Sequence, residues 1–281
     1  MIFDGKKIRD EIMSELKSRI LKLKKQPVLA VIWVGNNAVT AKYVEIKQKQ
    51  AEKLGIKFNL IKYDESAEES GIFSKIDELN ANNNIDGIMV QIPMPKNIDQ
   101  NKVIAAISPK KDIDGLRFCS NLSCDFKPPV VGAILQALKL CSKKLFESKI
   151  VVVGKGFLVG APLIRALTDL TRDLQVADSS TENLSQMTGD ADIIISATGK
   201  PNIITPMMVK DGVVLVDAGT SESNGALTGD IDPAAYSKAS FYTPVPGGIG
   251  PVTVAMLFRN LVEAAEKTNN YQCCVIKLIN P

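Results

Sequence analysis

Hydrophobic residues in the first half of the chain follow helical and strand patterns in alternation. Isoleucine and leucine recur every four residues near the start, which predicts an amphipathic helix through Ile8, Ile12, Leu16 and Ile20. A continuous apolar run over 28–34 then predicts a buried strand. The pattern continues with a helix over 40–54, a strand over 57–63, a helix over 71–82 and a strand over 87–92. Strands separated by helices favour a parallel sheet with helices on its faces.

The second half repeats this alternation and adds a glycine-rich turn. We expect a helix over 131–140, a strand over 150–153, and a helix over 162–170 after the turn. Further strands are expected over 174–177, 192–197 and 213–216, and a last helix over 253–267, whereas 269–281 shows no clear pattern. The predicted fold is α/β with two domains, each a mostly parallel sheet with flanking helices, the second a Rossmann-type doubly wound dinucleotide-binding domain. We place the first domain at 1–120 together with the C-terminal helix (about 254–281), and the second at 121–253.

The composition narrows the chemistry, because the chain of 281 residues contains no histidine. Ser-His-Asp and Cys-His nucleophilic sites are excluded in their usual form, as are histidine-ligated zinc, copper and iron sites. Acid–base chemistry near neutral pH must then depend on lysine, aspartate, glutamate, cysteine or tyrosine. We expect no metal site.

Charge and cysteine content exclude further classes of protein. The formal net charge is +3, from 34 basic and 31 acidic residues with no long basic run, so we expect no nucleic-acid partner. The five cysteines lack C-x-x-C spacing, which favours reduced thiols over a disulfide framework or a zinc ribbon. The N-terminal segment carries charges where a signal peptide needs an apolar core, and no run approaches about 20 apolar residues. We therefore expect a cytoplasmic protein without a membrane partner.

The segment that follows the strand over 150–153 reads G-K-G-F-L-V-G. Glycines let a backbone turn sharply and approach a pyrophosphate, and a helix N-terminus favours an anion, so strand, turn and helix together predict a dinucleotide site. Glycines also form ordinary tight turns, and the spacing is one residue longer than the common fingerprint. Lys155 in the turn favours the 2′-phosphate of NADP, whereas Asp178 at the next strand end would repel it. Asp178 also fits an exposed strand-end carboxylate.

A second candidate site lies on the helix predicted over 40–54. Thr40, Tyr43 and Lys47 are spaced by three and four residues and so share one helix face. If the tyrosine ring shielded it from water, the lysine would give up its proton more readily, because burial disfavours the charged form. A solvated lysine on a surface helix is the other interpretation of this pattern.

Five motifs occur along the chain in a fixed order. They are V-G-N-N-A-V-T-A-K-Y-V-E-I-K-Q-K (34–49), D-G-I-M-V-Q-I-P-M-P (86–95), P-K-K-D-I-D-G (109–115), G-K-G-F-L-V-G-A-P-L (154–163) and T-P-V-P-G-G-I-G-P-V-T (243–253). Together they resemble the bifunctional methylenetetrahydrofolate dehydrogenase/methenyltetrahydrofolate cyclohydrolase family of one-carbon metabolism. The resemblance runs from Asp4 to about Asn260.

The resemblance implies roles for individual residues. Lys47 matches the general acid/base of the cyclohydrolase step, Tyr43 the tyrosine that packs on the pterin, and Gln91 the glutamine that orients the lysine. Asp114 matches the carboxylate that holds the amino-pyrimidine edge of the pterin and completes this catalytic set; by itself it would be an ordinary turn residue. The implied substrate-binding set is Thr40, Tyr43, Val90, Gln91, Ile92, Asp114, Pro246, Gly247 and Gly248. The implied cofactor-binding set is Gly154, Lys155, Gly156, Gly160, Asp178, Ser179 and Thr220.

The function that the resemblance implies is oxidation of 5,10-methylenetetrahydrofolate by NAD(P)+, followed by hydrolysis of the methenyl product to 10-formyltetrahydrofolate. The hydride step mainly requires alignment of two rings, and the hydrolysis requires a proton shuttle that a lysine can provide. The resemblance also implies a homodimer formed through the nucleotide-binding domain, and NADP as the cofactor with NAD as the alternative. Two other hypotheses stay open: a monofunctional member that keeps one step, and a non-catalytic folate- or nucleotide-binding paralogue.

Four positions depart from the usual pattern of that family. The interdomain segment 127–132 lacks the usual cysteine and threonine, and Gly156 replaces the serine of the common G-R-S turn. Asp178 stands where a histidine usually precedes the serine, and Val252 stands where P-M-T has methionine. None of the four is in the implied catalytic set, so they bear on cofactor choice more than on chemistry.

Overall fold

The computed structural model describes residues 1–223 and 226–279, which separate into two compact units. One unit comprises residues 11–127 and the chain from Leu257 onward; we call it the three-stranded unit after its sheet. The other comprises residues 1–10 and 128–256 and is called the five-stranded unit. Helices α1 (Gly5–Ile20) and α9 (Ile249–Ile279) have residues in both. The predicted α/β class with two parallel sheets is confirmed.

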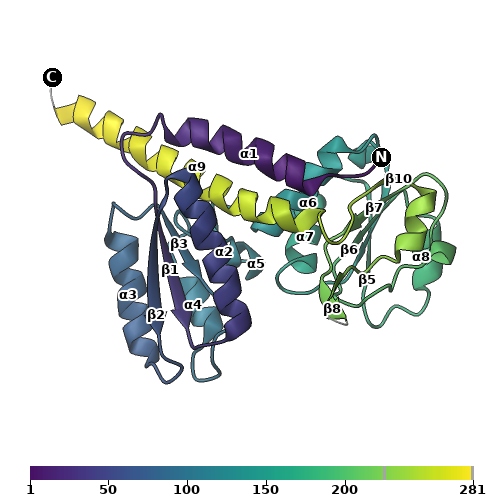
Figure 1. Ribbon diagram of the computed structural model, residues 1–281, viewed down its shortest axis with the longest axis horizontal. Helices are drawn as coiled ribbons and strands as arrows, with labels where there is room; N and C mark the ends of the chain where they lie inside the picture. Colours follow the sequence, from purple (N-terminus) through teal and green to yellow (C-terminus); the bar gives the residue numbers. More distant parts are fainter. Residues whose placement is uncertain (224–225, 280–281) are drawn as a thin grey trace. The chain divides into compact units, whose positions relative to one another are not determined.

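The three-stranded unit is built around a largely buried central strand. Its parallel strands lie in the order β2 (Lys57–Tyr63), β1 (Val28–Val34), β3 (Gly87–Val90). The helices of this unit include α2 (Ala38–Leu54), α3 (Glu69–Ala81), α4 (Gln100–Ala106) and the short α5 (Leu116–Cys119) (Figure 1). From Leu29 to Val34 every residue of β1 is buried, as expected for the middle strand of a parallel sheet covered on both faces.

The five-stranded unit is a doubly wound parallel sheet. Its strands lie in the order β10 (Ala239–Tyr242), β7 (Val213–Asp217), β6 (Ile193–Ser196), β4 (Lys149–Val153), β5 (Asp173–Ala177). Its helices are α6 (Pro129–Leu140), α7 (Gly160–Leu167) and α8 (Leu184–Gly189), with 3-10 turns η1 (Leu145–Glu147), η2 (Pro206–Met208) and η3 (Pro233–Lys238). Strands β8 (Ser221–Ser223) and β9 (Ala226–Thr228) form an antiparallel pair. The winding reverses between β4 and β6, and ligands of such sheets bind at the carboxyl ends of the strands beside this reversal.

All the predicted helices and strands are present, with ends shifted by a few residues. The last helix, α9, extends beyond the pattern over 253–267 and continues to Ile279, which agrees with the C-terminal helix of about 254–281 in the domain assignment; residues 280–281 lie outside the described residues. The pattern missed α4, α5, α8, β10 and the β8–β9 pair, which are all short. Such elements depend on local caps and neighbours, as where Asp99 accepts hydrogen bonds from Asn101 N–H and Lys102 N–H at the start of α4.

Residues 1–10 group with the five-stranded unit, which the sequence did not indicate. Phe3 N–H donates to the Tyr242 carbonyl (2.9 Å), and Gly5 N–H donates to the Gly247 carbonyl (3.0 Å). The N-terminal segment therefore extends beside β10 and supports the loop that follows it. This loop contains Pro246–Gly248, part of the predicted substrate-binding set.

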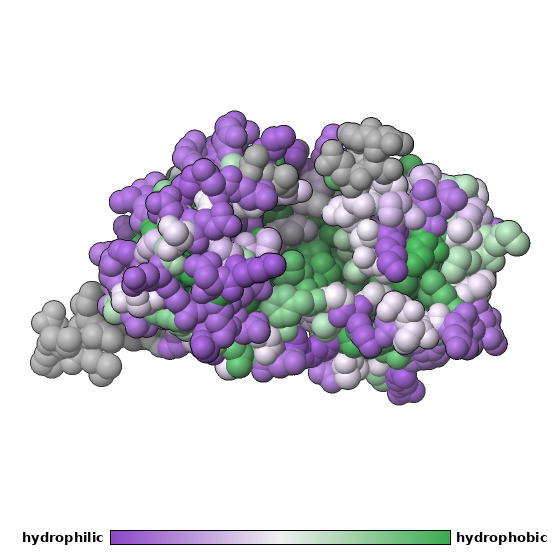
Figure 2. Space-filling model, turned by 90° about the horizontal axis from the view of Figure 1, so that it is seen from below, coloured by the Kyte–Doolittle hydropathy of each residue, from purple (hydrophilic) through white to green (hydrophobic). Residues whose placement is uncertain are grey.

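The face of the molecule drawn in Figure 2 is mainly polar. Hydrophilic side chains cover most of it, and apolar ones gather in a few patches. In the described part of the chain, no helix is both long and apolar enough to span a bilayer. Cys119, Cys124 and Cys141 are free thiols, as predicted; Cys273 and Cys274 lie where the structure does not describe side chains.

Candidate active site

Helix α2 places Lys47 on the side that packs against the sheet. At its start, Asn37 Oδ1 accepts a hydrogen bond from Thr40 N–H (3.1 Å), which satisfies a donor that the helix leaves free. Val44 and Ala51 are buried, and Lys47 lies three residues after the first and four before the second. This spacing puts the lysine on the apolar face of the helix. Its side chain is half-buried rather than solvated.

The ammonium group of Lys47 is held by two side chains at the end of β3. Its Nζ donates to Gln91 Oε1 (3.3 Å) and to Met89 Sδ (3.4 Å). Gln91 is fixed in turn, because its N–H donates to the Ile32 carbonyl (2.8 Å) and its Nε2 to the Ile92 carbonyl (3.1 Å). The amide oxygen is thereby left for the lysine. Met89 was not predicted, although residues two apart in a strand share a face and this offset from Gln91 is a usable signal.

Asp114 lies in the turn before α5, in the same unit. It is half-buried, and no described residue donates a hydrogen bond to its carboxylate. Burial raises the pKa of this carboxyl, and the nearby Lys47 ammonium opposes the rise. Both carboxylate oxygens are therefore available to N–H groups of a ligand.

The turn that carries Asp114 is fixed from two sides. The neighbouring Asp112 is fully buried and accepts hydrogen bonds from Leu116 N–H (3.2 Å) and Arg117 N–H (2.7 Å) at the start of α5. Burial raises the pKa of Asp112 to about 6. On the other side, the buried Asn260 of α9 donates through Nδ2 to the Ile113 carbonyl (2.9 Å) and the Lys127 carbonyl (3.0 Å). Asp112 and Asn260 thus hold the turn, whereas Asp114 is left to the ligand.

The remaining predicted residues of this unit differ in exposure. Tyr43 is 55% exposed, so its ring is accessible to a flat ligand. Val90 is buried and offers only its backbone, whereas Ile92 is half-buried. Thr40 lines a cavity of about 600 Å³ together with residues from the carboxyl ends of β1 and β3, including Trp33 and Pro93. Carboxyl ends of parallel strands are the usual place for a ligand.

In the five-stranded unit, the glycine-rich turn after β4 allows no side chain at two of its glycines. Gly154 has φ +100°, and a Cβ there would lie 2.6 Å from the Ala197 carbonyl oxygen. A Cβ on Gly160 would overlap the Gly154 carbonyl oxygen. Gly156 instead faces open space and is exposed. A tight turn with an open outer edge, followed by α7, fits a dinucleotide pyrophosphate.

The two residues that gave opposite indications of cofactor preference are paired with each other. The Lys155 ammonium forms an ion pair with the Asp178 carboxylate, and Ser180 donates to the same carboxylate from N–H (2.8 Å) and Oγ (2.6 Å). Lys155, followed by Ser180, holds the pKa of Asp178 well below its usual range. Ser179 and Thr220 are exposed at the same carboxyl edge. Neither charge of the pair therefore acts alone on a cofactor.

The loop Pro246–Gly248 also belongs to the five-stranded unit. Pro246 is exposed, Gly248 is buried, and Gly247 has φ +106°. A Cβ on Gly5 would overlap the Gly248 carbonyl oxygen, so the N-terminal segment packs directly on the loop. The predicted site residues therefore form two groups: Lys47, Gln91 and Asp114 come together in one unit, and this loop and the cofactor set are in the other.

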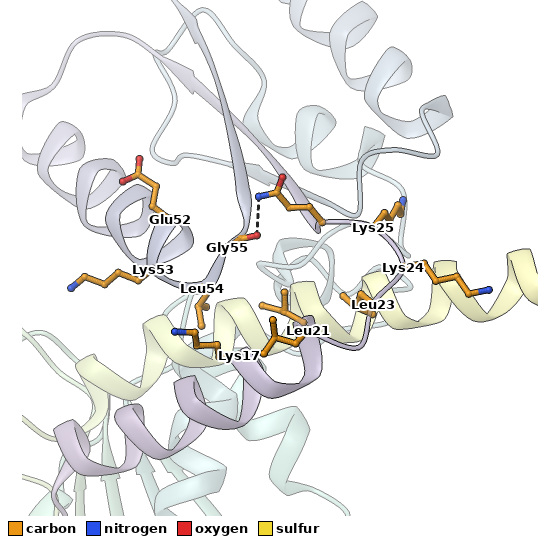
Figure 3. A pocket seen from close by; sticks show the side chains of 11 residues that line it. Lys17, Leu21, Leu23, Lys24, Lys25, Glu52, Lys53, Leu54 and Gly55 are labelled. Atoms are coloured by element: carbon orange, nitrogen blue, oxygen red, sulfur yellow. Dashed lines mark hydrogen bonds between the residues drawn. The ribbon is translucent and has the colours of Figure 1, made fainter.

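Two further features bear on what can bind to this protein and where. Among the described residues, no group of three cysteine, aspartate or glutamate side chains is arranged to hold a metal ion. A second cavity, of about 460 Å³, lies at the ends of α1 and α2 (Figure 3). Leu21, Leu23 and Leu54 lie within it, whereas Lys24 and Lys53 point in opposite directions. This cavity is beside the amino ends of β1 and β2, away from the end of β3 that holds Lys47.

Comparisons with known proteins agree across the chain. The family model of the tetrahydrofolate dehydrogenase/cyclohydrolase catalytic domain matches residues 3–114, and that of the NAD(P)-binding domain matches residues 128–269. The bifunctional protein FolD of Macrococcus caseolyticus is 37% identical, with 95% of this chain and 98% of that protein covered. The crystal structure of the FolD dehydrogenase/cyclohydrolase from Campylobacter jejuni is 33% identical with a TM-score of 0.90, covering 95% and 99% of the two chains. The Trypanosoma brucei FolD structure, complexed with NADP and an inhibitor, is 26% identical with a TM-score of 0.86, covering 95% and 97%.

Proposed function

Because the chain belongs to the tetrahydrofolate dehydrogenase/cyclohydrolase family, we propose that it catalyses both reactions of that family. It oxidises 5,10-methylenetetrahydrofolate with a nicotinamide dinucleotide and hydrolyses the methenyl product to 10-formyltetrahydrofolate. The three-stranded unit is the folate-binding catalytic domain, and the five-stranded unit is the dinucleotide-binding domain. The contact of Lys47 with Gln91 is the observation that carries the proposal, because it gives a chain without histidine a positioned proton-transfer group.

The hydrolysis is assigned to Lys47. Water adds to the methenyl carbon and loses a proton, a ring nitrogen gains a proton as the C–N bond opens, and the hydroxyl loses its remaining proton as the formyl C=O forms. The net result is the release of one proton, and a positioned amine can perform these transfers as general base and general acid. Gln91 keeps the amine in place through its side-chain oxygen. Its backbone N–H and its Nε2 both donate to backbone carbonyls, so the oxygen faces the lysine. The half-buried setting of Lys47 limits competition from bulk water.

Folate binding is assigned to Asp114 and Tyr43. The free carboxylate of Asp114 can accept two parallel N–H bonds from the amino-pyrimidine edge of the pterin, a charge-assisted pairing. The exposed ring of Tyr43 offers a flat apolar face for an aromatic ligand. Val90 and Ile92 complete this surface, Val90 through its backbone, and Thr40 borders it at the 600 Å³ cavity. Pro246, Gly247 and Gly248 of the five-stranded unit are assigned to substrate binding by the resemblance alone.

The dinucleotide, when bound, accepts the hydride. The chain's own contribution is to bind and align it: the Gly154–Gly160 turn provides close approach for the pyrophosphate, and Ser179 and Thr220 provide exposed hydroxyls at the same edge. Hydride transfer needs no protein proton carrier, since alignment of the two rings provides most of the rate. The absence of histidine therefore does not impair this step.

NADP is the proposed cofactor, with NAD as the alternative. The Trypanosoma brucei relative is described in complex with NADP, and a 2′-phosphate carries more charge than the Asp178 carboxylate with which it would compete for Lys155. Asp178 opposes this choice, since a carboxylate at the end of the second strand suits a ribose hydroxyl. The ratio of kcat/KM for NADP+ and NAD+ tests the assignment: a ratio above one supports NADP, and a ratio below one assigns NAD.

Two further properties are proposed from the sequence and its resemblance. A cytoplasmic location is consistent with the free thiols at Cys119, Cys124 and Cys141, because an oxidising compartment favours disulfides. A homodimer through the nucleotide-binding domain is expected from the family. Sedimentation of the purified protein measures the assembly directly, and a monomer at micromolar concentration would exclude the dimer.

The function is tested by separate assays of the two steps on the purified protein. Reduced dinucleotide formation from 5,10-methylenetetrahydrofolate reports the dehydrogenase, and decay of added 5,10-methenyltetrahydrofolate above the uncatalysed rate reports the cyclohydrolase. Activity in both supports the bifunctional enzyme. Activity in one supports the monofunctional alternative, and inactivity in both with either dinucleotide contradicts the proposal.

A further inference from the structure

A buried carboxylate lies beside the loops of the proposed dinucleotide site but is not among its predicted residues. Asp230 follows β9 in the five-stranded unit and is fully buried. Its Oδ2 accepts three hydrogen bonds: from Ser196 Oγ (2.8 Å), Thr198 N–H (2.6 Å) and Thr198 Oγ1 (2.9 Å). These donors come from the end of β6 and the loop after it, whereas Oδ1 is buried beside the Gly219 backbone and receives no hydrogen bond from the described residues. The contacts of Oδ2 therefore have to hold the side chain, because a buried polar group without partners is costly.

Thr198 connects this carboxylate to the glycine-rich turn. Its hydroxyl donates to Asp230 and also accepts a hydrogen bond from Lys200 N–H (3.1 Å), which orders the loop after β6. A Cβ placed on Gly154 would lie 3.2 Å from Thr198 Cγ2, so the threonine methyl packs against the turn. Asp230 thus fixes a side chain that supports the backbone expected to receive the pyrophosphate.

Asp230 also contacts the loop that follows β7. A Cβ on Gly219 would overlap the Asp230 carboxylate, so the glycine backbone lies directly on it. The adjacent carboxylate of Asp217 accepts hydrogen bonds from Gly219 N–H (3.0 Å) and Asp230 N–H (3.2 Å), which ties the same two segments together. Thr220, in the predicted cofactor set, comes next in the chain. Asp230 therefore joins the loops after β6 and β7 beside the reversal of winding.

We propose that Asp230 is a positioning residue of the dinucleotide site, which holds the loops after β6 and β7, and through Thr198 the Gly154 turn, in the conformation that binds the cofactor. This inference rests on the proposed function for the identity of the ligand. A carboxylate suits the task because it only accepts hydrogen bonds and can serve several donors at one oxygen. Asparagine has the same shape but brings an N–H₂ group and loses the charge.

The test compares Asp230→Asn with Ser196→Ala, which removes one donor to the same oxygen without touching the loop. NADPH affinity is measured by fluorescence titration, and hydrolysis of 5,10-methenyltetrahydrofolate is measured without dinucleotide. We expect Asp230→Asn to raise the Kd of NADPH and the KM of NADP+ by about tenfold or more, the scale of one charge-assisted hydrogen bond. Hydrolysis stays within about twofold, and Ser196→Ala changes Kd by less than about threefold.

The outcomes separate the inference from the function that it presupposes. If the wild-type protein binds NADPH and Asp230→Asn binds it equally well, the inference is wrong. A parallel loss of hydrolysis and binding also contradicts it, because that pattern indicates a general folding role. If Asp230→Asn does not fold, Thr198→Val replaces it, since valine keeps the methyl packing and removes the hydroxyl; an unchanged Kd then contradicts the inference. Failure of the wild type to bind NADPH refutes the proposed function instead.

Discussion

Replacement of Asn260 by alanine tests how the turn that presents Asp114 is held. The Asn260 side chain donates to the Ile113 and Lys127 carbonyls at 2.9 and 3.0 Å, and the residue is 8% exposed. Alanine removes both donors at once, and water has little access to replace them. The Ile113 carbonyl is buried, and leaving it without a donor costs about 1–3 kcal/mol; the Lys127 carbonyl is only partly buried and adds less, so the free energy of unfolding falls by about 2–4 kcal/mol.

The functional consequence follows from the position of Ile113 beside Asp114. Without the Asn260 side chain, the turn loses one of its two supports and the Asp114 carboxylate is less precisely placed for the folate. KM for folate therefore rises in both reactions, whereas kcat changes less. Urea unfolding gives the stability, and the two activity assays give KM. Thr268→Ala is the matched control, because that hydroxyl of α9 donates to the Ala264 carbonyl of its own helix (3.0 Å). A loss below about 1 kcal/mol for Asn260→Ala, or an unchanged KM despite the loss, would refute the reasoning.

Three further predictions concern the five-stranded unit. Asp178→Asn releases Lys155 and raises the kcat/KM ratio of NADP+ over NAD+ severalfold, whereas Lys155→Gln lowers it; an unchanged ratio would show that the pair does not select the cofactor. Gly160→Ala places a Cβ against the Gly154 carbonyl and weakens NADPH binding by more than about tenfold, with hydrolysis retained as the control. Burial raises the pKa of Asp217 to about 7, so the folded protein holds a proton that the unfolded chain releases near pH 4. The unfolding free energy therefore falls between about pH 4 and 7 by up to about 1.4 kcal/mol per pH unit, and urea unfolding of Asp217→Asn should lack this slope.

Strands β1 and β2 were predicted best because their signal is local. β1 and β2 begin and end where the pattern placed them, and β1 is a continuous apolar run that stops at Gly35. β10, of four residues, could not be predicted, since it is defined by pairing with β7 rather than by an apolar run of its own. The grouping of residues 1–10 with the five-stranded unit has the same cause, because it depends on Tyr242 and Gly247, more than 200 residues away in the chain.

In the candidate site, too, local spacing could be interpreted from the sequence, whereas contacts between residues far apart in the chain could not. The helical spacing around Lys47 allowed both a solvated and a buried lysine; its position between Val44 and Ala51 favours the buried face, but only the structure brings Gln91 to it. Lys155 and Asp178 were weighed as opposing influences, because nothing in the sequence indicates that the two side chains pair. Asp230 gave no signal at all, since its donors lie more than 30 residues earlier.

The central claim is that Lys47 transfers protons in the hydrolysis, whereas hydride transfer does not use this amine as a proton carrier. Lys47→Met keeps most of the apolar stem of the side chain and removes the amine. Lys49→Met serves as control, because Lys49 is exposed and pairs with Glu45 on the outer side of α2. The decisive measurement is the rate of 5,10-methenyltetrahydrofolate hydrolysis by the two variants. We predict a fall of about 100-fold or more for Lys47→Met with measurable NADPH formation, and little change for Lys49→Met. Hydrolysis by Lys47→Met at the wild-type rate would contradict the account.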